Sequence, residues 1–213
     1  MSINYFIHKN MVEGVNEAAR ANWTNSVQKL IDLDESDDWE IFKRKGDWVG
    51  MRMKTDVLFA LKGECIINSD PQPIIDLIRV PENKLKFSPD IEAAELLHDV
   101  DGNLKIIYNR IKTPPIISNR DAVFVQGMQQ DGEDTYIAST STVFPERPEI
   151  DGVVRVNVII GGYIVRPIEP GKCTFSYIMN VDPRGDIPSA VTNMVQKRQI
   201  KIVLTIRDIV CGK

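Results

Sequence analysis

The residues of this sequence that could bind a metal or act as nucleophiles are three cysteines and two histidines. Cys65, Cys173 and Cys211 lie far apart without any Cys-x-x-Cys spacing, and only His8 and His98 could complete a ligand set. A structural zinc site needs four such ligands at short spacings, and a catalytic cysteine needs a histidine held by a third group. We therefore expect no metal, no cofactor and no Cys–His nucleophile.

Motifs that mark the common classes of enzyme are also missing. The sequence has no Gly-x-Ser-x-Gly, no Gly-x-x-x-x-Gly-Lys-[Ser/Thr], no Gly-x-Gly-x-x-Gly and no His-Glu-x-x-His. The pair Gly161-Gly162 falls inside a long strand pattern, where a bulge or bend explains it better than phosphate binding does. We predict that the protein is not an enzyme.

The charge balance argues against a nucleic-acid partner. The chain of 213 residues carries 26 Lys and Arg against 30 Asp and Glu, a net charge of -4, so no overall positive field attracts a phosphate backbone. Residues 1–10 lack the pattern of a signal peptide, and no stretch reaches the ~18 apolar residues of a spanning helix. We expect a cytoplasmic protein.

The elements that must position any site begin with a helix and a hairpin. Between residues 11 and 33, apolar residues recur at spacings of three and four, which places them on one face of a helix. Further along, Gly46-Asp47 separates two segments in which apolar and polar residues alternate, a pattern typical of a hairpin. Ser69-Asp70 can cap a following helix, with Pro71 in its first turn. The expected elements are a helix over 11–33, strands over 39–45, 48–54 and 57–68, and a helix over 71–80.

The second half of the chain has almost only strand patterns before a final helical stripe. Turns such as Asp101-Gly102 and Asp131-Gly132 separate the strands, and short turns join antiparallel neighbours. The expected strands cover 93–100, 104–112, 121–129, 135–143, 153–168 and 173–181, and the helix covers 191–209.

This order predicts one α+β domain over residues 1–213. A curved antiparallel sheet of about nine strands would wrap around the long C-terminal helix, with the N-terminal helix added. Such a sheet cannot close tightly around a single helix. We therefore expect a cavity between the sheet and the helix.

The loop between the strands expected at 104–112 and 121–129 contains two prolines followed by two isoleucines. Pro114-Pro115 forces an extended backbone, and Ile116 and Ile117 place two large aliphatic side chains near its tip. These isoleucines either fill the core or form a gate that dips into a membrane. The sequence leaves both interpretations open.

Five segments together resemble the START (StAR-related lipid transfer) family. They are Ile106-Ile107-Tyr108, Ser118-Asn119-Arg120-Asp121-Ala122-Val123, Gly152-Val153-Val154-Arg155-Val156, Gly162-Tyr163-Ile164-Val165-Arg166-Pro167 and Val181-Asp182-Pro183-Arg184-Gly185-Asp186-Ile187-Pro188-Ser189. The resemblance implies the helix-grip fold and a hydrophobic tunnel for one lipid molecule, which a monomer transfers between membranes or senses. It also implies a lid that touches membranes transiently, formed by Pro115, Ile116, Ile117 and, from the final helix, Met194.

The resemblance also implies which side chains face the tunnel. In the START-like register the predicted lipid contacts are Lys84, Ile107, Asn109, Phe124, Gln126, Arg155, Asn157 and Ile159. Plain hydrophobic alternation favours the opposite register for the last three, because Val154, Val156, Val158 and Ile160 form the more apolar set.

The nature of the lipid is left open. Lys84 stands where family members often have an arginine; it is either a headgroup partner or a solvated lysine. Phosphatidylcholine carriers of the family enclose the ammonium with aromatic rings, whereas Asn109, Ala122 and Ile159 occupy the matching positions. This disfavours phosphatidylcholine and leaves sterol, ceramide-like and anionic lipids.

Alternative functions are small-molecule binding, an enzyme with a non-lipid substrate, or a signalling scaffold with a vestigial pocket.

Overall fold

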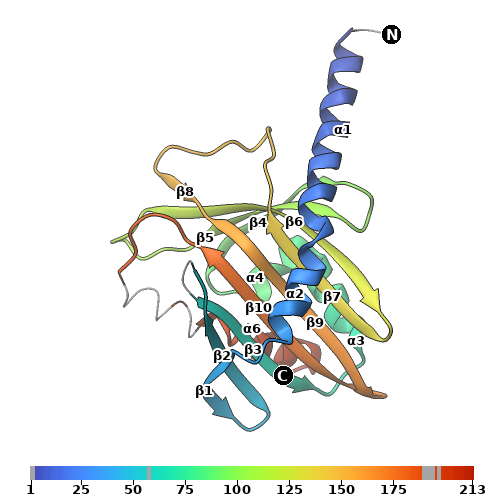
Figure 1. Ribbon diagram of the computed structural model, residues 1–213, viewed down its shortest axis with the longest axis vertical. Coiled ribbons are helices and arrows are strands. Elements are labelled where there is room, and N and C mark those ends of the chain that lie inside the picture. Colours follow the sequence, from blue (N-terminus) through green and yellow to red (C-terminus); the bar gives the residue numbers. More distant parts are fainter. Residues whose placement is uncertain (1–2, 57–58, 189–194, 196–197) are drawn as a thin grey trace.

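One curved sheet forms the frame of the structure (Figure 1). The computed structural model describes residues 3–56, 59–188, 195 and 198–213. Within these residues the strand order is β1-β2-β3-β10-β9-β7-β6-β5-β4, with β8 paired to β6. The strands are β1 (Glu40–Lys45), β2 (Trp48–Lys54), β3 (Phe59–Ile67), β4 (Ile91–Asp99), β5 (Lys105–Ile111), β6 (Asn119–Asp131), β7 (Asp134–Ser141), β8 (Val153–Arg155), β9 (Asn157–Glu169) and β10 (Lys172–Asp182).

Tight turns with glycine join several neighbouring strands of the sheet. Gly46 between β1 and β2 and Gly132 between β6 and β7 have φ angles of 60° and 59°, a conformation that glycine adopts at little cost. Connections this short impose antiparallel pairing. The predicted hairpin at Gly46-Asp47 and the predicted turn at Asp131-Gly132 are confirmed.

The predicted fold class is confirmed, with a curved antiparallel sheet between an N-terminal and a C-terminal helix. The segment 153–168 differs from its prediction as one strand. It forms β8, which runs parallel to β6, and then β9, with a break at Val156. The long loop 142–152 before β8 permits the parallel pairing, since only tight turns require the antiparallel one.

Two helices cover the outer face of the sheet (Figure 1). Helix α1 (Ile3–Thr24) and helix α2 (Ser26–Asp34) replace the single helix predicted over 11–33. The Thr24 and Ser26 hydroxyls donate to main-chain carbonyls four residues earlier at 2.7 and 3.3 Å, a bond that tends to bend helices. The Trp23 indole donates to the Ala138 carbonyl at 3.0 Å and fixes the bend against β7.

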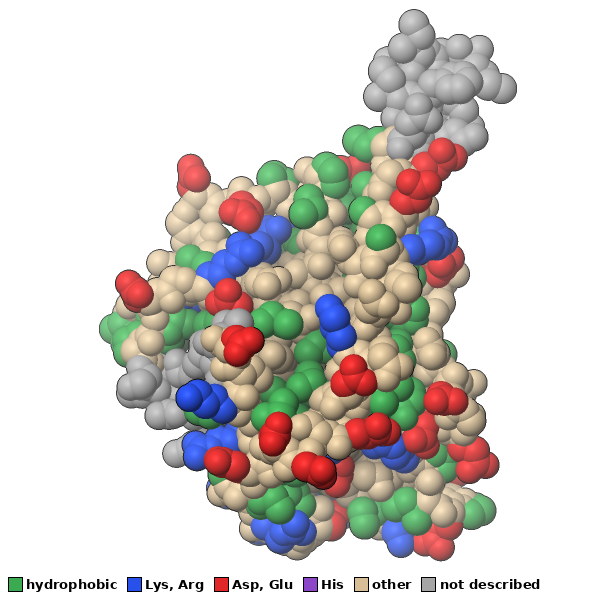
Figure 2. Space-filling view, viewed as in Figure 1, with side chains coloured by type: hydrophobic (Ala, Val, Ile, Leu, Met, Phe, Trp, Pro, Cys, Tyr) green, Lys and Arg blue, Asp and Glu red, His purple; other side chains and the backbone are tan. Residues whose placement is uncertain are grey.

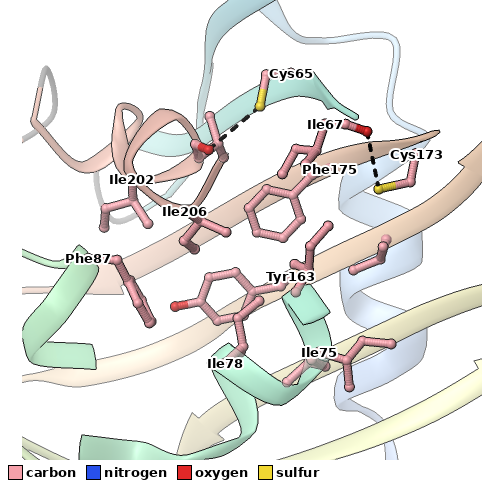
Figure 3. Close-up of a cluster of buried hydrophobic side chains, with 14 of the residues drawn as sticks. Cys65, Ile67, Ile75, Ile78, Phe87, Tyr163, Cys173, Phe175, Ile202 and Ile206 are labelled. Atoms are coloured by element: carbon pink, nitrogen blue, oxygen red, sulfur yellow. Dashed lines mark hydrogen bonds between the residues drawn. The ribbon is translucent and has the colours of Figure 1, made fainter. Parts of the chain in front are cut away.

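The inner face of the sheet packs against the remaining helices. These are α3 (Pro71–Arg79), the short η1 (Pro81–Asn83), α4 (Lys84–Phe87) and α6 (Ile202–Val210). Figure 3 shows Phe87, Ile202 and Ile206 meeting Tyr163 and Phe175 of the sheet, all of them buried. The predicted helix over 71–80 is confirmed, with Pro71 in its first turn.

The chain just before α6 approaches β3 unusually closely. A Cβ atom on Gly63 would lie 2.3 Å from the Ile200 carbonyl oxygen, and the Trp48 indole donates to the same oxygen at 3.3 Å. The Cys65 thiol donates to the Val203 carbonyl at 3.6 Å. Of the long helix predicted over 191–209, residues 191–194 and 196–197 lie outside the described residues.

We expect Gly63→Ala to destabilise the protein by roughly 1–3 kcal/mol, the usual cost of overpacking an interior. The added methyl would collide with a main-chain oxygen that cannot move without shifting α6. Urea denaturation measures the change. Gly161→Ala is the matched control, because its new Cβ would meet nothing closer than 3.6 Å. Equal stability of the two variants would contradict the close approach.

Candidate functional site

A cavity of about 220 Å³ lies between the inner face of the sheet, α4 and the chain before α6. Hydrophobic side chains form most of its wall, and many of them come from six strands. Those on strands include Phe59, Leu61, Ile91, Ile111, Ala122, Phe124, Val158, Met179 and Val181, and Val156 joins them from the break before β9. A wall of this composition suits an apolar ligand.

Strand alternation directs these side chains inward. On β5 and β6, Asn109 and Phe124 face the cavity, whereas the neighbouring Tyr108 and Val123 pack beneath α1. On β9 the alternation is interrupted, since Val158 pairs with Val181 while Ile160 pairs with Asn180. This bulge makes Ile159 an extra residue. Val158 therefore lines the cavity, and Ile160 faces α2 on the other side.

Lys84 and Asn109 form a polar site in the cavity wall. In the amide orientation that satisfies both of its neighbours, the Asn109 oxygen accepts from Lys84 Nζ at 3.3 Å and its nitrogen donates to the Tyr108 carbonyl at 3.0 Å. Lys84 Nζ also lies 5.2 Å from the centre of the Phe124 ring. Burial lowers the pKa of Lys84 to about 8, because the charged amine is removed from water.

Two tyrosines form a second polar group in the wall. Tyr163 and Tyr177 are cross-strand partners on β9 and β10, with ring centres 5.0 Å apart. Burial raises the pKa of Tyr163 well above its ordinary value, so its hydroxyl is neutral. Figure 3 shows this hydroxyl pointing toward Phe87 of α4. Among the described residues it has no hydrogen-bond partner, whereas the Tyr177 hydroxyl meets Gln199 at 3.5 Å.

Gln199 links the cavity to the start of the C-terminal helix. Its amide donates to the buried Asp90 carboxylate at 3.0 Å, and Arg198 pairs with the same carboxylate at 3.0 Å. A buried carboxylate of this kind must be paired to be tolerated. Asp90 therefore anchors the chain before α6 to the start of β4.

Two loops border one end of the cavity, which we call its mouth. Lys112, Thr113, Pro114 and Ile117 line it from the β5–β6 loop, and Pro183 and Ile187 line it from the segment after β10. Arg120 joins the two loops. Its guanidinium donates to the Ser118 carbonyl at 2.8 Å, to Pro183 at 3.2 Å and to Arg184 at 3.1 Å.

The structure brings together some of the predicted lipid contacts. Lys84, Asn109 and Phe124 line the cavity. Ile107 is buried behind the wall in a cluster with Ala122 and Phe124. Gln126 is buried and donates to the Ser139 hydroxyl, which lines the cavity, at 3.1 Å.

The register predicted for Arg155, Asn157 and Ile159 requires correction. Arg155 forms a two-pronged ion pair with buried Asp121, at 2.6 and 3.0 Å, away from the cavity. Arg155 and Asn157 instead line a second hollow of about 400 Å³ beneath the loop 142–152. Ile159 is the bulge residue and lines neither. The pairing with Asp121 favours this register, because it satisfies a carboxylate that is only 1% exposed.

The predicted lid residues occupy different places. Ile116 is 73% exposed at the loop tip, Pro115 is exposed beside it, and Ile117 turns into the cavity. Met194 lies outside the described residues. In Figure 2, hydrophobic side chains lie at the left edge of the molecule, where Figure 1 places these two loops.

Reasoning from the sequence missed Tyr163, Tyr177 and Gln199. The two tyrosines become neighbours only because Tyr163 of β9 pairs with Tyr177 of β10. The sequence does not reveal the register of these two strands. Gln199 lies on the helical stripe but is polar, so a search for apolar residues passes over it. Burial raises the pKa of the Cys65 thiol to about 12 and that of the Cys173 thiol to about 11, which makes both poor nucleophiles.

Comparison with known proteins identifies the fold family. A family model described as the START domain matches residues 20–208. The chain belongs to the START domain family. Among curated proteins, the mitochondrial steroidogenic acute regulatory protein of Oncorhynchus mykiss is 26% identical over 195 residues, which cover 86% of this chain and 68% of that protein. Human START domain-containing protein 10 is 25% identical over 122 residues, which cover 57% of this chain and 42% of that protein.

Solved structures show the same START fold. Human StAR-related lipid transfer protein 5 superposes with a TM-score of 0.79 at 16% identity, covering 96% of this chain and 98% of that one. Human STARD10 gives a TM-score of 0.78 at 18% identity, covering 87% of this chain and 78% of that one. Within the described residues of this START domain, no helix is long and apolar enough to cross a membrane.

We expect Lys84→Met to leave the START domain at least as stable as the wild type at pH 7. The amine is charged in the folded and unfolded chains below about pH 8, so folding must bury that charge. Between about 8 and the unperturbed 10.5, the unfolded chain binds a proton that the folded one has lost. Wild-type stability therefore rises with pH in this window relative to Lys84→Met.

Urea denaturation of both proteins from pH 7 to pH 10 tests this. Lys86→Met is the matched control, because Lys86 lies on the same helix with its side chain exposed. A stability difference between wild type and Lys84→Met that does not change with pH would refute the burial of the charged amine.

Proposed function

We propose that this START domain binds one lipid molecule in the cavity and carries it between membranes. The cavity between the sheet, α4 and the chain before α6, with its apolar wall and its mouth between two loops, carries the proposal. A lipid exposes several hundred Å² of apolar surface, which costs several kcal/mol in water at ~25 cal/mol/Å². Enclosure within the cavity removes most of this cost during transit.

The polar groups in the wall give the lipid headgroup its partners. Lys84, Asn109 and the Tyr163 hydroxyl offer donors and an acceptor in an otherwise hydrophobic space. A buried headgroup without hydrogen bonds would lose roughly 1–3 kcal/mol per group. These three residues, with Phe124 beside Lys84, are the proposed contacts. Ile107 and Gln126 support them from behind, and Arg155, Asn157 and Ile159 are no longer included.

The name of one structural neighbour supports transport rather than catalysis, because that human protein is called a StAR-related lipid transfer protein. The proposal is of a non-enzymatic carrier, a monomer in the cytoplasm, formed as a single domain. A related function is that the domain binds the lipid as a sensor and does not transfer it.

We place the lid at the loop between β5 and β6 together with the segment after β10. Ile116 at the tip would enter the headgroup region of a membrane, while Arg120 releases the main-chain carbonyls that it holds. The net charge of -4 gives anionic membranes no general attraction, so the contact would be brief.

Delipidated protein is expected to extract one lipid per chain from mixed vesicles. The vesicles contain phosphatidylcholine, phosphatidate, cholesterol, ceramide and oleate, so that these lipids compete for the protein. Native mass spectrometry then reports the mass of the bound lipid and the number of lipid molecules per chain. Phosphatidylcholine is expected to be bound least. If no lipid is bound from such a panel, the carrier function is wrong and a small-molecule ligand becomes the better hypothesis.

Ile116→Asp is expected to slow lipid transfer between vesicles by roughly tenfold, because a charged side chain at the tip resists entry into the membrane. Affinity for a lipid supplied in detergent should stay unchanged, since Ile116 does not line the cavity. Ile168→Asp is the matched control, because Ile168 is 50% exposed near the β9–β10 turn, at the other end of the sheet (Figure 1). If both variants transfer lipid at the same rate, the loop tip does not contact the membrane.

A further inference from the structure

The charges that line the cavity all have one sign. Among the described lining residues, Lys84, Lys112 and Arg120 are cationic, and no side chain is acidic. This contrasts with the whole chain, whose net charge is -4. A ligand in the cavity therefore meets positive charge only.

None of these three cations forms an ion pair within the described residues. Arg120 donates to three main-chain carbonyls, which are neutral. Lys84 contacts the neutral amide of Asn109 and the ring of Phe124. Lys112 is exposed at the mouth. Lys84 is therefore a positive charge in the interior wall without a carboxylate partner.

The buried carboxylates near the cavity are held by other cations. Asp90, which follows α4, pairs with Arg198 and accepts a hydrogen bond from Gln199. Asp121 on β6 is held by both prongs of Arg155. Neither carboxylate is left to balance Lys84. Lys84 is half-buried, and a charge that is largely removed from water without a counter-charge is costly, so a ligand of opposite charge would recover that cost.

We propose that the lipid carried in the cavity has an anionic headgroup, a carboxylate or a phosphate, that pairs with Lys84. This inference rests on the proposed lipid-binding function and specifies the ligand class. A neutral headgroup leaves the Lys84 charge without a counter-charge, whereas an anion neutralises it. The Tyr163 hydroxyl, which has no partner among the described residues, offers a further donor from the same wall.

Paired probes with the same hydrocarbon chain isolate the headgroup charge. Oleate is compared with oleyl alcohol, and 1-oleoyl lysophosphatidate with 1-oleoylglycerol, using the full chain after delipidation. Fluorescence of the native tryptophans or titration calorimetry gives each dissociation constant. We expect at least one anion to bind roughly tenfold or more tightly than its neutral partner, the usual value of a charge-assisted hydrogen bond. The pair that shows the preference distinguishes a carboxylate from a phosphate.

Substitution of the lysine assigns the preference to a residue. Lys84→Met should remove the preference for the anion and leave binding of the neutral partner nearly unchanged. Lys86→Met, on the same helix but exposed, should keep the preference. Lys84→Arg should keep it at least in part, because the charge remains. Melting temperatures of all variants report whether each one folds.

Each result decides a separate point. Neutral probes that bind wild type as tightly as the anions overturn the inference, even if Lys84→Met fails to fold. A preference that persists in Lys84→Met overturns the role of Lys84. If only neutral lipids are extracted from vesicles, the inference fails while the carrier function stands. If no lipid of any class is bound, both fail.

Discussion

The close contact between Gly63 and the Ile200 carbonyl oxygen determines where the C-terminal helix can lie. Only a residue without a side chain allows the backbone of β3 to come so near. The Trp48 indole then fixes the same oxygen from β2. The same stretch of chain reaches the cavity, because Gln199, which directly precedes Ile200, lines it together with Phe59 and Leu61 of β3. The contact at Gly63 therefore fixes the chain beside the cavity.

The interior charges are arranged so that one lysine remains unbalanced. The buried carboxylates each have a cationic partner, in the pairs Asp34–Lys62, Asp90–Arg198 and Asp121–Arg155. These pairs join elements far apart in the sequence, and removing one partner from such a pair is strongly destabilising. Lys84 is different, because it joins no elements through a carboxylate and its amine borders the cavity. Within the described part of the chain its contacts are the neutral Asn109 amide and the Phe124 ring, so the proposed ligand would supply the missing counter-charge.

Periodicity in the sequence predicted the hairpins and the order of elements, because these depend on neighbours along the chain. The inward positions on β5 and β6 were predicted from the resemblance to the START family, and of these Asn109 and Phe124 lie on the cavity wall. The bulge at Ile159 could not be predicted in this way, since one extra residue reverses every later position without changing the composition. The parallel pairing of β8 and the stacking of Tyr163 on Tyr177 likewise depend on partners distant in the sequence.

The mouth and the interior of the cavity are held by opposite ends of one segment of chain. Arg120 binds the carbonyls of Pro183 and Arg184 at the mouth, and Asp90 binds Arg198 and Gln199 near the start of α6. The bonds of Arg120 are hydrogen bonds from a charged donor to neutral oxygens, whereas the buried carboxylate of Asp90 is held by an ion pair with the partly exposed Arg198 and by a hydrogen bond from Gln199. The mouth end is therefore the weaker attachment. Local openings in folded proteins begin at the weakest attachments, so the proposed lid would release the bonds of Arg120 before those of Asp90.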